Sequence, residues 1–247
     1  MSVLVQLQGV SKRFGSGTAL HPVNLSFARH KTTVLIGPSG CGKSTLLRLI
    51  IGLLEADTGS IEFDGTRINS ATITEFRRRI GYVIQEGGLF PHLTARKNVL
   101  LMSRHLKEPA TKMNHRVAEL CSLTRLSPAT LDRYPIELSG GQRQRISLTR
   151  ALALSPELLL LDEPLGALDP LVRASLQKDL KEVFARLQQT AILVTHDLAE
   201  ASYLGDEIVL MNEGRVIQIG TIDDLRTKPA NEFVTEFINA QRGLAFP

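Results

Sequence analysis

The chain has 247 residues, of which 43% are hydrophobic and 22% are charged. This composition is typical of a globular protein with one large domain or two closely joined smaller ones, and it excludes a disordered or fibrous chain. The net charge of +4 is spread along the sequence and there is no tryptophan, so neither a basic arm nor a stacking platform for single strands is indicated. We therefore expect no nucleic-acid partner.

The sequence also argues against a membrane span, a secretion signal and a transition-metal site. The apolar run Leu158–Leu161 is far shorter than the roughly 20 residues that cross a bilayer, and the start MSVLVQLQGV lacks a basic segment followed by an apolar block. Cys41 and Cys121 lack metal-ligand spacing, and the six histidines are scattered. We expect a cytoplasmic location.

Four short apolar runs end at a glycine or a polar residue. In chain order, TTVLI ends at Gly37, YVI at Gln85, LLLL at Asp162 and AILVT at His196. Runs that are apolar at every position suit parallel strands buried on both faces, and ligands of open parallel sheets bind at the carboxyl ends of the strands. We therefore expect these four residues to line one site, although Gln85 or His196 taken alone could be an ordinary satisfied polar side chain.

Helical spacing of apolar residues runs from Leu93 to about Leu126, and Pro128 and Pro135 then interrupt it. We predict a mostly helical subdomain over residues 91–150.

The remaining segments are assigned to the core and to a tail. Residues 1–90 and 151–222 are predicted to form an α/β core into which the helical subdomain is inserted. Within this core, DEIVLMNEGRVIQIGT predicts two strands around a turn at Asn212–Gly214. Residues 223–247 are predicted to be a short C-terminal helical tail.

The segment GPSGCGKST, Gly37–Thr45, matches G-x-x-x-x-G-K-[ST] between a predicted strand and a predicted helix. Glycines let backbone N–H groups close around a triphosphate at a helix N-terminus, whose dipole favours negative charge. Lys43 would reach the β and γ phosphates, and the Ser44 hydroxyl would bind Mg²⁺. The alternative is a glycine-rich turn that binds nothing. The predicted phosphate-binding residues are Gly37, Pro38, Ser39, Gly40, Cys41, Gly42, Lys43, Ser44 and Thr45.

Cys41 lies inside this loop, where a helix N-terminus is expected to increase the reactivity of a thiol. We predict that alkylation of Cys41 blocks nucleotide binding and that bound ATP with Mg²⁺ protects the thiol.

The segment LLLLDEP places Asp162 and Glu163 next to each other at a strand end. Asp162 suits a contact with Mg²⁺ through water, and Glu163 is placed to polarise the water that attacks the γ phosphate. Phosphoryl transfer requires positioning and charge neutralisation rather than covalent chemistry, so these groups are sufficient parts. A simple solvated turn is the alternative, but the adjacent apolar run and the phosphate loop favour hydrolysis.

The segment LSGGQRQR, Leu138–Arg145, supplies no obvious nucleophile, base or metal ligand. With the phosphate loop, LSGGQ, LLLLDEP, GALD and VTHD in that order, the chain resembles the ATP-binding cassette (ABC) transporter ATPases along nearly its whole length. The resemblance implies an α/β fold: a P-loop NTPase core with a mostly parallel sheet flanked by helices, an N-terminal antiparallel β portion and a helical subdomain.

The resemblance implies roles for four further residues. Phe14 matches the aromatic residue that stacks on adenine, although it could instead be a core phenylalanine on an early strand. Gln85 matches the glutamine that contacts Mg²⁺ and links the site to the membrane partner. His196 matches the switch histidine that contacts the γ phosphate, and Asp169 of GALD matches the aspartate that communicates across the dimer.

The resemblance also gives LSGGQ a target on another molecule. Ser139 and the backbone amides of Gly140 and Gly141, with Gln142 nearby, would complete the ATP site of a second copy of the chain. Small residues at a helix start leave donors exposed toward an anion, which is consistent with this role. Two ATP molecules would then be buried between two head-to-tail subunits.

The segment Tyr82–Val99 looks like the corresponding region of bacterial importers, most of all those for osmoprotectant quaternary amines such as glycine betaine, choline or carnitine. Expected partners are transmembrane permease subunits and, indirectly, an extracytoplasmic solute-binding protein, with the chain on the inner face of the membrane. Alternatives are an importer ATPase for an amino acid, polyamine or anion, an exporter ATPase, and a non-transport cassette acting on DNA or ribosomes.

Two features depart from the resemblance. Lys97 stands before Asn98 where relatives usually carry an acidic residue, which would alter the contact with the membrane subunit and puts the class of solute in doubt. The sequence also ends at Pro247 without the regulatory extension of many osmoprotectant ATPases, so ionic-strength sensing through such a domain is not expected.

Overall fold

The computed structural model describes residues 2–85, 87–166 and 168–243, which form two compact units. The terminal unit contains the described residues up to Arg77 and from Thr190 onward, and the central unit contains Arg78–Gln189. The predicted helical segment 91–150 lies within the central unit, which extends beyond it on both sides. The division into the core 1–90 and 151–222 and the tail 223–247 stays a prediction.

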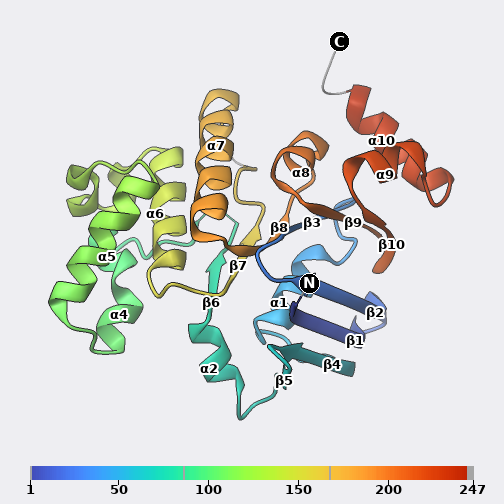
Figure 1. Ribbon diagram of the computed structural model, residues 1–247, viewed down its shortest axis with the longest axis horizontal. Coiled ribbons are helices and arrows are strands. Elements are labelled where there is room, and N and C mark those ends of the chain that lie inside the picture. Colours follow the sequence, from blue (N-terminus) through green and yellow to red (C-terminus); the bar gives the residue numbers. More distant parts are fainter. Residues whose placement is uncertain (1, 86, 167, 244–247) are drawn as a thin grey trace. The chain divides into compact units, whose positions relative to one another are not determined.

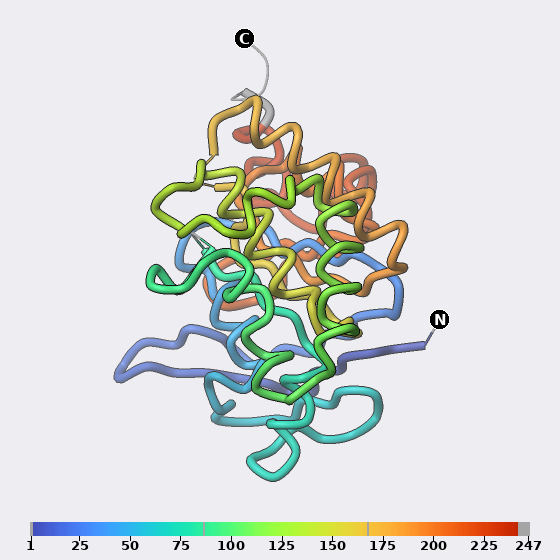
Figure 2. Tube along the Cα trace, turned by 90° about the vertical axis from the view of Figure 1, so that its left-hand side faces the viewer, coloured from blue at the N-terminus to red at the C-terminus, as the bar shows by residue number. Residues whose placement is uncertain are grey.

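The terminal unit begins with an antiparallel sheet of four strands in the order β2-β1-β4-β5 (Figure 1). Its longest strands run side by side as a dark blue hairpin in Figure 2. Along β2, Val23, Leu25 and Phe27 are buried while Asn24 and Ser26 are exposed, the alternation of a strand with one covered face. The bounds are β1 Val3–Phe14, β2 Gly17–Ala28, β4 Thr58–Phe63 and β5 Thr66–Arg67.

A second group of strands in the terminal unit surrounds β3, which pairs in parallel with both β8 and β9. Every residue of β3 and β8 is buried, as expected for parallel strands covered on both faces. The predicted hairpin is confirmed, because β9 and β10 pair antiparallel and the turn residues Glu213 and Gly214 both have positive φ. The bounds are β3 Thr32–Ile36, β8 Thr190–Val194, β9 Glu207–Asn212 and β10 Arg215–Gly220.

The described part of the C-terminal tail is helical, as predicted, in α9 and α10, and residues 244–247 of that prediction lie outside the described residues. Arg77 of α2 closes the end of α1 by donating to the carbonyl oxygens of Ile51 and Gly52, at 3.1 and 2.7 Å. The bounds are α1 Lys43–Ile50, α2 Ile73–Arg78, α8 Leu198–Leu204, α9 Ile222–Thr227 and α10 Glu232–Gly243.

The central unit contains two parallel strands, β6 (Ile80–Val83) and β7 (Leu158–Asp162). The apolar run LLLL and its polar stop at Asp162 are therefore confirmed as a buried strand. The prediction for β6 was wrong by one residue, because Ile84 lies beyond the strand and is 38% exposed. An apolar residue type alone does not show whether a strand still pairs with another strand at that position.

Helices make up most of residues 91–150, the predicted helical segment. The stretch from Leu93 to Leu126 contains three helices, and Lys107, with φ 56°, and Pro109 lie between the second and the third. Val117 and Leu120 of that helix are buried, which confirms the helical spacing. The bounds are α3 Ala95–Val99, α4 Leu101–His105, α5 Ala110–Leu123, α6 Gly140–Leu152 and α7 Pro170–Leu187, with 3-10 turns at Pro128–Asp132 and Pro135–Glu137.

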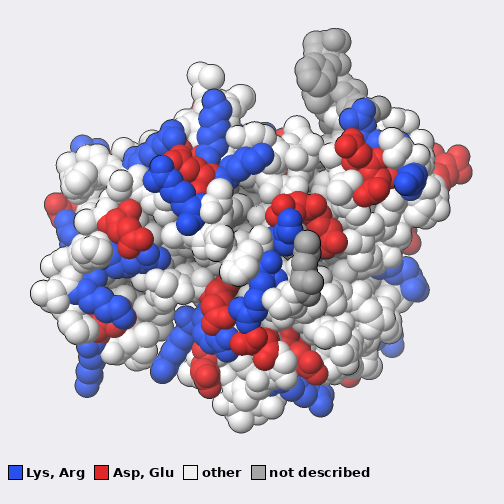
Figure 3. All heavy atoms as spheres, viewed as in Figure 1, with Lys and Arg blue, Asp and Glu red and all other residues white. Residues whose placement is uncertain are grey.

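Helices α6 and α7 are joined by a buried ion pair. Asp179 is 1% exposed and accepts from Nη2 of Arg145 at 2.7 Å, and Nε of Arg125 lies 3.2 Å from its other oxygen. A carboxylate removed from water requires such partners, so this pair fixes how α6 lies against α7. Figure 3 shows basic side chains gathered around acidic ones over these two helices.

Within residues 2–85, 87–166 and 168–243, none of the helices is both long enough and apolar enough to cross a bilayer.

Candidate functional site

The phosphate loop follows β3 and runs into α1, in the context predicted from the sequence. Gly37 has φ 146°, and a Cβ there would overlap the carbonyl oxygen of Met211 on β9. Gly42 has φ 102°, and a Cβ there would lie 2.6 Å from the carbonyl oxygen of Ala19. Neighbouring strands therefore shape the loop from outside, and only glycine fits at these two positions.

Lys43 is the first residue of α1, and its side chain folds back over the loop. Its Nζ donates to the carbonyl oxygens of Gly37 and Pro38, both at 2.9 Å, and the residue is 6% exposed. The residue before α1, Gly42, has no side chain to cap the first-turn N–H groups, which lack partners within the helix. A buried ammonium and uncapped amides at one helix start are the features that bind a phosphate group.

Cys41 is 2% exposed, and its Sγ lies 3.6 Å from Nζ of Lys43. Its carbonyl oxygen accepts from the N–H of Gly214, so the β9–β10 turn holds it in place. A thiol reagent reaches this sulfur only when the loop opens, which opposes the ready modification expected from the helix start. That alkylation blocks nucleotide binding stays a prediction.

His196 follows β8, and the parallel pairing of Leu35 with Val194 places it at the same sheet edge as Gly37. The predicted meeting of these two polar strand ends is confirmed within the terminal unit. His196 is exposed, and the residues on both sides of it are fixed.

The sequence analysis missed the hydrogen-bond network that holds Thr195 and Asp197, the residues on either side of His196. Buried Thr195 donates from Oγ1 to Oε2 of buried Glu200 at 2.6 Å, and Asp197 caps α8 by accepting from the N–H groups of Ala199 and Glu200. An Asp followed three residues later by Glu is a known signal of a helix start and could have located this network.

Phe14 ends β1 and is 51% exposed, so the alternative of a core phenylalanine was wrong. Nζ of Lys12 lies 5.8 Å from the centre of its ring, within range of a cation–π contact. An exposed ring is free to stack on a base, and that role stays a prediction.

In the central unit, the parallel pairing of Val83 with Leu161 brings Gln85 and Asp162 to one sheet edge, as predicted. Asp162 is 5% exposed, whereas Gln85 is exposed. Glu163 has φ 46°, a left-handed conformation that costs a residue with a side chain about 1 kcal/mol or more. Such local strain is typical of residues whose side chain must be aimed at a particular point.

A cavity of about 290 Å³ in the central unit is lined by Gln85, Gly140 and Glu163 together with Arg143 and Gln144. Three of the predicted motifs thus meet in one polar pocket. Arg143 was not singled out from the sequence, because nothing in LSGGQRQR distinguishes it from Arg145. The structure separates the two, since Arg145 pairs with Asp179 and Arg143 lines the cavity.

The start of α6 is a reciprocal cap. Ser139 Oγ accepts from the N–H of Gln142 at 3.2 Å, and Gln142 Oε1 accepts from the N–H of Ser139 at 3.0 Å. The N–H groups of Gly140 and Gly141 are the first-turn donors that this cap does not use. A Cβ at Gly141 would lie 2.6 Å from Cγ1 of Val172, so its glycine is also required for packing against α7.

Asp169 is exposed and caps α7, accepting from the N–H of Val172 at 3.0 Å, and Pro170 begins the helix. The structure thus gives Asp169 a local role that was not predicted. Communication across a dimer stays a prediction for it, and Ala167 of GALD lies outside the described residues.

The predicted Mg²⁺ ligands are divided between the two units. Ser44 lies in the terminal unit, and Gln85 and Asp162 lie in the central unit. Across the ranges described by the structure, no three His, Cys, Asp or Glu residues are grouped as a metal site. Hydroxyl, amide and carboxylate oxygens are nevertheless the hard ligands that Mg²⁺ takes when phosphates supply the rest.

Comparison with known proteins decides the family. The family model described as ABC transporter matches residues 20–166, which include the phosphate loop, LSGGQ and the acidic strand. The chain belongs to the ABC transporter family.

Relatives within this family include transport proteins for different solutes. The chain is 47% identical, over 97% of its length, to the glycine betaine/carnitine/choline transport ATP-binding protein OpuCA of Bacillus subtilis, and spans 63% of that protein. It is 44% identical to the glycine betaine uptake system ATP-binding protein YehX of Escherichia coli, over 95% of this chain and 76% of that one. A sulfate/thiosulfate import ATP-binding protein, CysA of Synechocystis, is 46% identical over 96% of this chain and 66% of that one.

Solved ABC structures share the fold. The dimeric ATP-binding cassette MJ0796, in a post-hydrolysis state bound to ADP and Pi, is 31% identical with a TM-score of 0.80, over 89% of this chain and 99% of that one. CbiO1 of Clostridium perfringens, part of an ABC transporter complex, is 28% identical with a TM-score of 0.84, over 100% of this chain and 97% of that one. The predicted α/β P-loop fold of ABC ATPases is thus confirmed.

Proposed function

We propose that the chain is the ATP-hydrolysing subunit of an importer, and that it energises uptake of a quaternary-amine osmoprotectant. The cavity that collects Gln85 and Glu163 carries this proposal, because it brings together the groups expected to sense a nucleotide and to hydrolyse it. The relatives named for glycine betaine, choline and carnitine support the choice of solute.

The proposed chemistry gives each predicted site residue a role. The phosphate loop and Lys43 bind the triphosphate, Phe14 stacks on the base and His196 contacts the γ phosphate. Mg²⁺, held by Ser44 and Gln85 and through water by Asp162, would neutralise charge on the phosphates. Glu163 accepts a proton from the attacking water, so its strained backbone serves to aim the carboxylate.

The substitution Glu163→Gln tests hydrolysis. The amide keeps the shape of the side chain but removes the base, so we expect phosphate release to fall by about 10² to 10⁴-fold while ATP still binds. The matched control is Glu119→Gln on the surface of α5, which we expect to leave the rate unchanged. A normal rate in Glu163→Gln would refute the role of Glu163.

We also propose that Ser139, Gly140 and Gly141 act on ATP held by a second copy of the chain. The dimeric relative supports this arrangement. Because Gly140 and Glu163 of one chain line the same cavity, action within a single chain is the competing arrangement.

The substitution Ser139→Arg separates these two arrangements. It should spare ATP binding by the monomer and block ATP-driven dimerisation, measured by light scattering, while Ser122→Arg at an exposed position on α5 should not. Hydrolysis per chain should rise with protein concentration. A rate independent of concentration, or loss of ATP binding by the Ser139→Arg monomer, would contradict the proposal.

The solute, the partners and the location belong to the same proposal. Transmembrane permease subunits would hold the chain at the inner face of the membrane, and an extracytoplasmic solute-binding protein would deliver the solute. Cells carrying Glu163→Gln should lose uptake of radiolabelled glycine betaine and choline but retain uptake of sulfate. The CysA relative makes sulfate the competing solute, and loss of sulfate uptake alone would favour it.

A further inference from the structure

Side chains of α6 hold Gly87 and Gly88, which follow Gln85 in the chain, through hydrogen bonds. Ser147, which is fully buried, donates from Oγ to the carbonyl oxygen of Gly87 at 2.7 Å. Arg150, one turn further along α6, donates from Nη2 to the same oxygen at 3.0 Å and from Nη1 to the carbonyl oxygen of Gly88 at 2.8 Å. Three hydrogen bonds therefore join one face of α6 to two consecutive carbonyl groups, and we call these contacts the clasp.

The segment held by α6 has a backbone conformation that favours glycine. Gly87 and Gly88 have φ of 78° and 53°, and a Cβ at Gly88 would overlap the side chain of Ile84. The N–H of Gly87 donates to the carbonyl oxygen of Ile84 at 3.0 Å and closes the turn that carries Gln85. The clasp therefore holds the base of the turn, and a shift of α6 would move Gln85 with it.

The clasp includes a charged donor, because Arg150 is half-buried and reaches from α6 to Gly87, which is buried, and to Gly88, which is exposed. Burial lowers the pKa of Arg150, yet a guanidinium remains charged at any physiological pH. A charge partly removed from water is stabilised by acceptors, and the carbonyl groups of Gly87 and Gly88 supply them. Hydrogen bonds from a charged donor are also stronger than neutral ones, which makes this contact suited to transmitting a displacement.

The other end of the same helix begins with LSGGQ. Ser139 caps α6, and Arg150 lies about 15 Å along its axis at 1.5 Å per residue. The helix is continuous over Gly140–Leu152, so a displacement of its first turn also displaces Ser147 and Arg150. One continuous helix thus joins LSGGQ, which the proposed function assigns to ATP of a second copy, to the turn of Gln85, the residue that the resemblance links to the membrane partner.

We propose that Ser147 and Arg150 are positioning residues that carry the movement of α6, when its first turn meets ATP, to the turn bearing Gln85. This inference rests on the proposed function, in which the first turn of α6 binds ATP of a second copy. Neither residue touches the nucleotide in this scheme, and both act through Gln85.

Amide hydrogen exchange tests the relay in the full-length chain carrying Glu163→Gln, with and without ATP and Mg²⁺. In this parent we expect ATP to slow exchange at Gly140 and Gly141 and also at Gly87, Gly88 and Leu89. With Arg150→Gln added, ATP should still slow exchange at Gly140 and Gly141 but should no longer slow it at Gly87–Leu89. Exchange at Gly87–Leu89 in the presence of ATP should then be about tenfold faster than in the parent. Arg150→Lys, which keeps one charged donor, should give an intermediate value.

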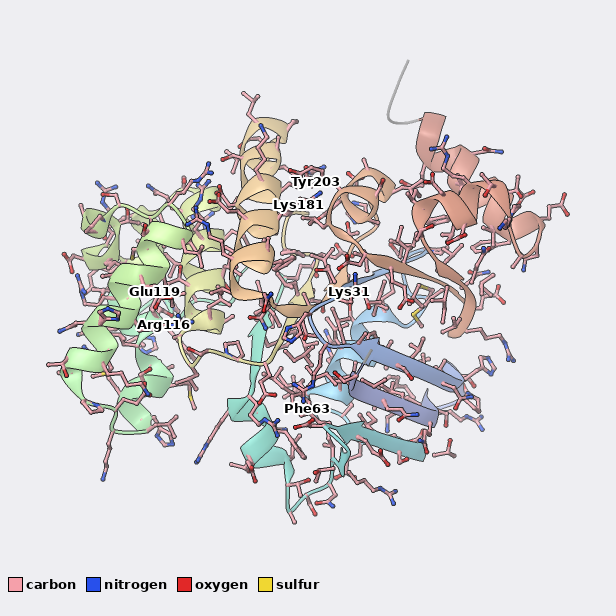
Figure 4. The ribbon with its side chains drawn as sticks, viewed as in Figure 1. Lys31, Phe63, Arg116, Glu119, Lys181 and Tyr203 are labelled. Carbon is pink, nitrogen blue, oxygen red and sulfur yellow. The ribbon has the colours of Figure 1, made fainter. Side chains whose placement is uncertain are left out.

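The matched control is Arg116→Gln on α5. Arg116 also donates to a carbonyl group of α6, from Nη2 to Leu152 O at 2.9 Å, but away from the clasp, and it lies beside Glu119 on α5 (Figure 4). We expect this control to keep both effects of ATP. Slow exchange at Val117 and Leu120 shows that each variant is folded, and Ser147→Ala provides a milder variant if Arg150→Gln unfolds.

Each remaining outcome contradicts the relay. If ATP protects Gly87–Leu89 equally in the parent and in the variant that carries both Arg150→Gln and Ser147→Ala, the clasp does not carry movement of α6 to this segment. Loss of that protection in Arg116→Gln as well would show general loosening of α6. Absence of any ATP effect at Gly140 and Gly141 in the parent would instead contradict the proposed function, and the relay with it.

Discussion

The phosphate loop of the terminal unit and the Gln85 turn of the central unit are held in different ways. Around the loop, Gly37 and Gly42 lie so close to the backbone of other strands that no side chain fits. Around the turn, Ser147 and Arg150 reach out from a helix to backbone carbonyl groups. The first region is fixed by its backbone and the second by side chains.

This difference suits the phosphate loop to binding a nucleotide and the Gln85 turn to moving when the nucleotide is bound. A loop shaped by close backbone contacts presents its amides in one geometry, which suits the recognition of a phosphate group. A turn held by side chains of a single helix can be displaced whenever the helix moves. We therefore expect changes in the first region to abolish binding and changes in the second to weaken the link between binding and its consequences.

The largest effect is expected from Gly37→Ala. The added Cβ meets the carbonyl oxygen of Met211 at a positive φ, so we expect a loss of stability of about 3 kcal/mol or more and no ATP binding. At Gly40, φ is 79° but no atom lies within 4 Å of a Cβ, so Gly40→Ala should cost only about 1–2 kcal/mol. Urea unfolding measures both, and equal losses would show that crowding of the loop is unimportant.

Alkylation of the two cysteines compares the units directly. Burial raises the pKa of the Cys121 thiol, so its thiolate fraction, and its rate with iodoacetamide, should be small near neutral pH and rise as pH increases. Cys41, at 2% exposure inside the loop, should react when the loop opens and should be protected by ATP with Mg²⁺, unlike Cys121. Mass spectrometry of labelled peptides measures both rates. Full modification of Cys41 with unchanged ATP binding would contradict the prediction that alkylation of this thiol blocks nucleotide binding.

The smallest effect is expected from Asp169. Removing the cap of α7 with Asp169→Ala should cost about 1 kcal/mol, whereas Asp169→Asn keeps a capping oxygen and should cost only a few tenths. Thermal unfolding measures the loss. If Asp169→Asn is stable but hydrolyses ATP slowly in the dimer, the charge acts across subunits, and a normal rate would leave the cap as the role of Asp169.

Local patterns were sufficient for much of the fold. The phosphate loop, the strands that end at Gly37 and Asp162, the β9–β10 hairpin and the helical spacing of Val117 and Leu120 each depend on neighbours within one turn or one strand. The end of β6 was misplaced at Ile84, because the end of a strand is set by its pairing with a distant segment.

The sequence by itself determined the kind of site, because a glycine-rich loop ending in Lys43 and an acidic pair at Asp162 and Glu163 carry their chemistry in their own residue types. Only the tertiary structure decided how these groups are held. The contacts of Gly37 with Met211, and of Arg150 with Gly87 and Gly88, join residues separated by 60 or more positions in the chain. Such contacts leave no periodic signal in a single sequence, since they depend on how strands and helices pack.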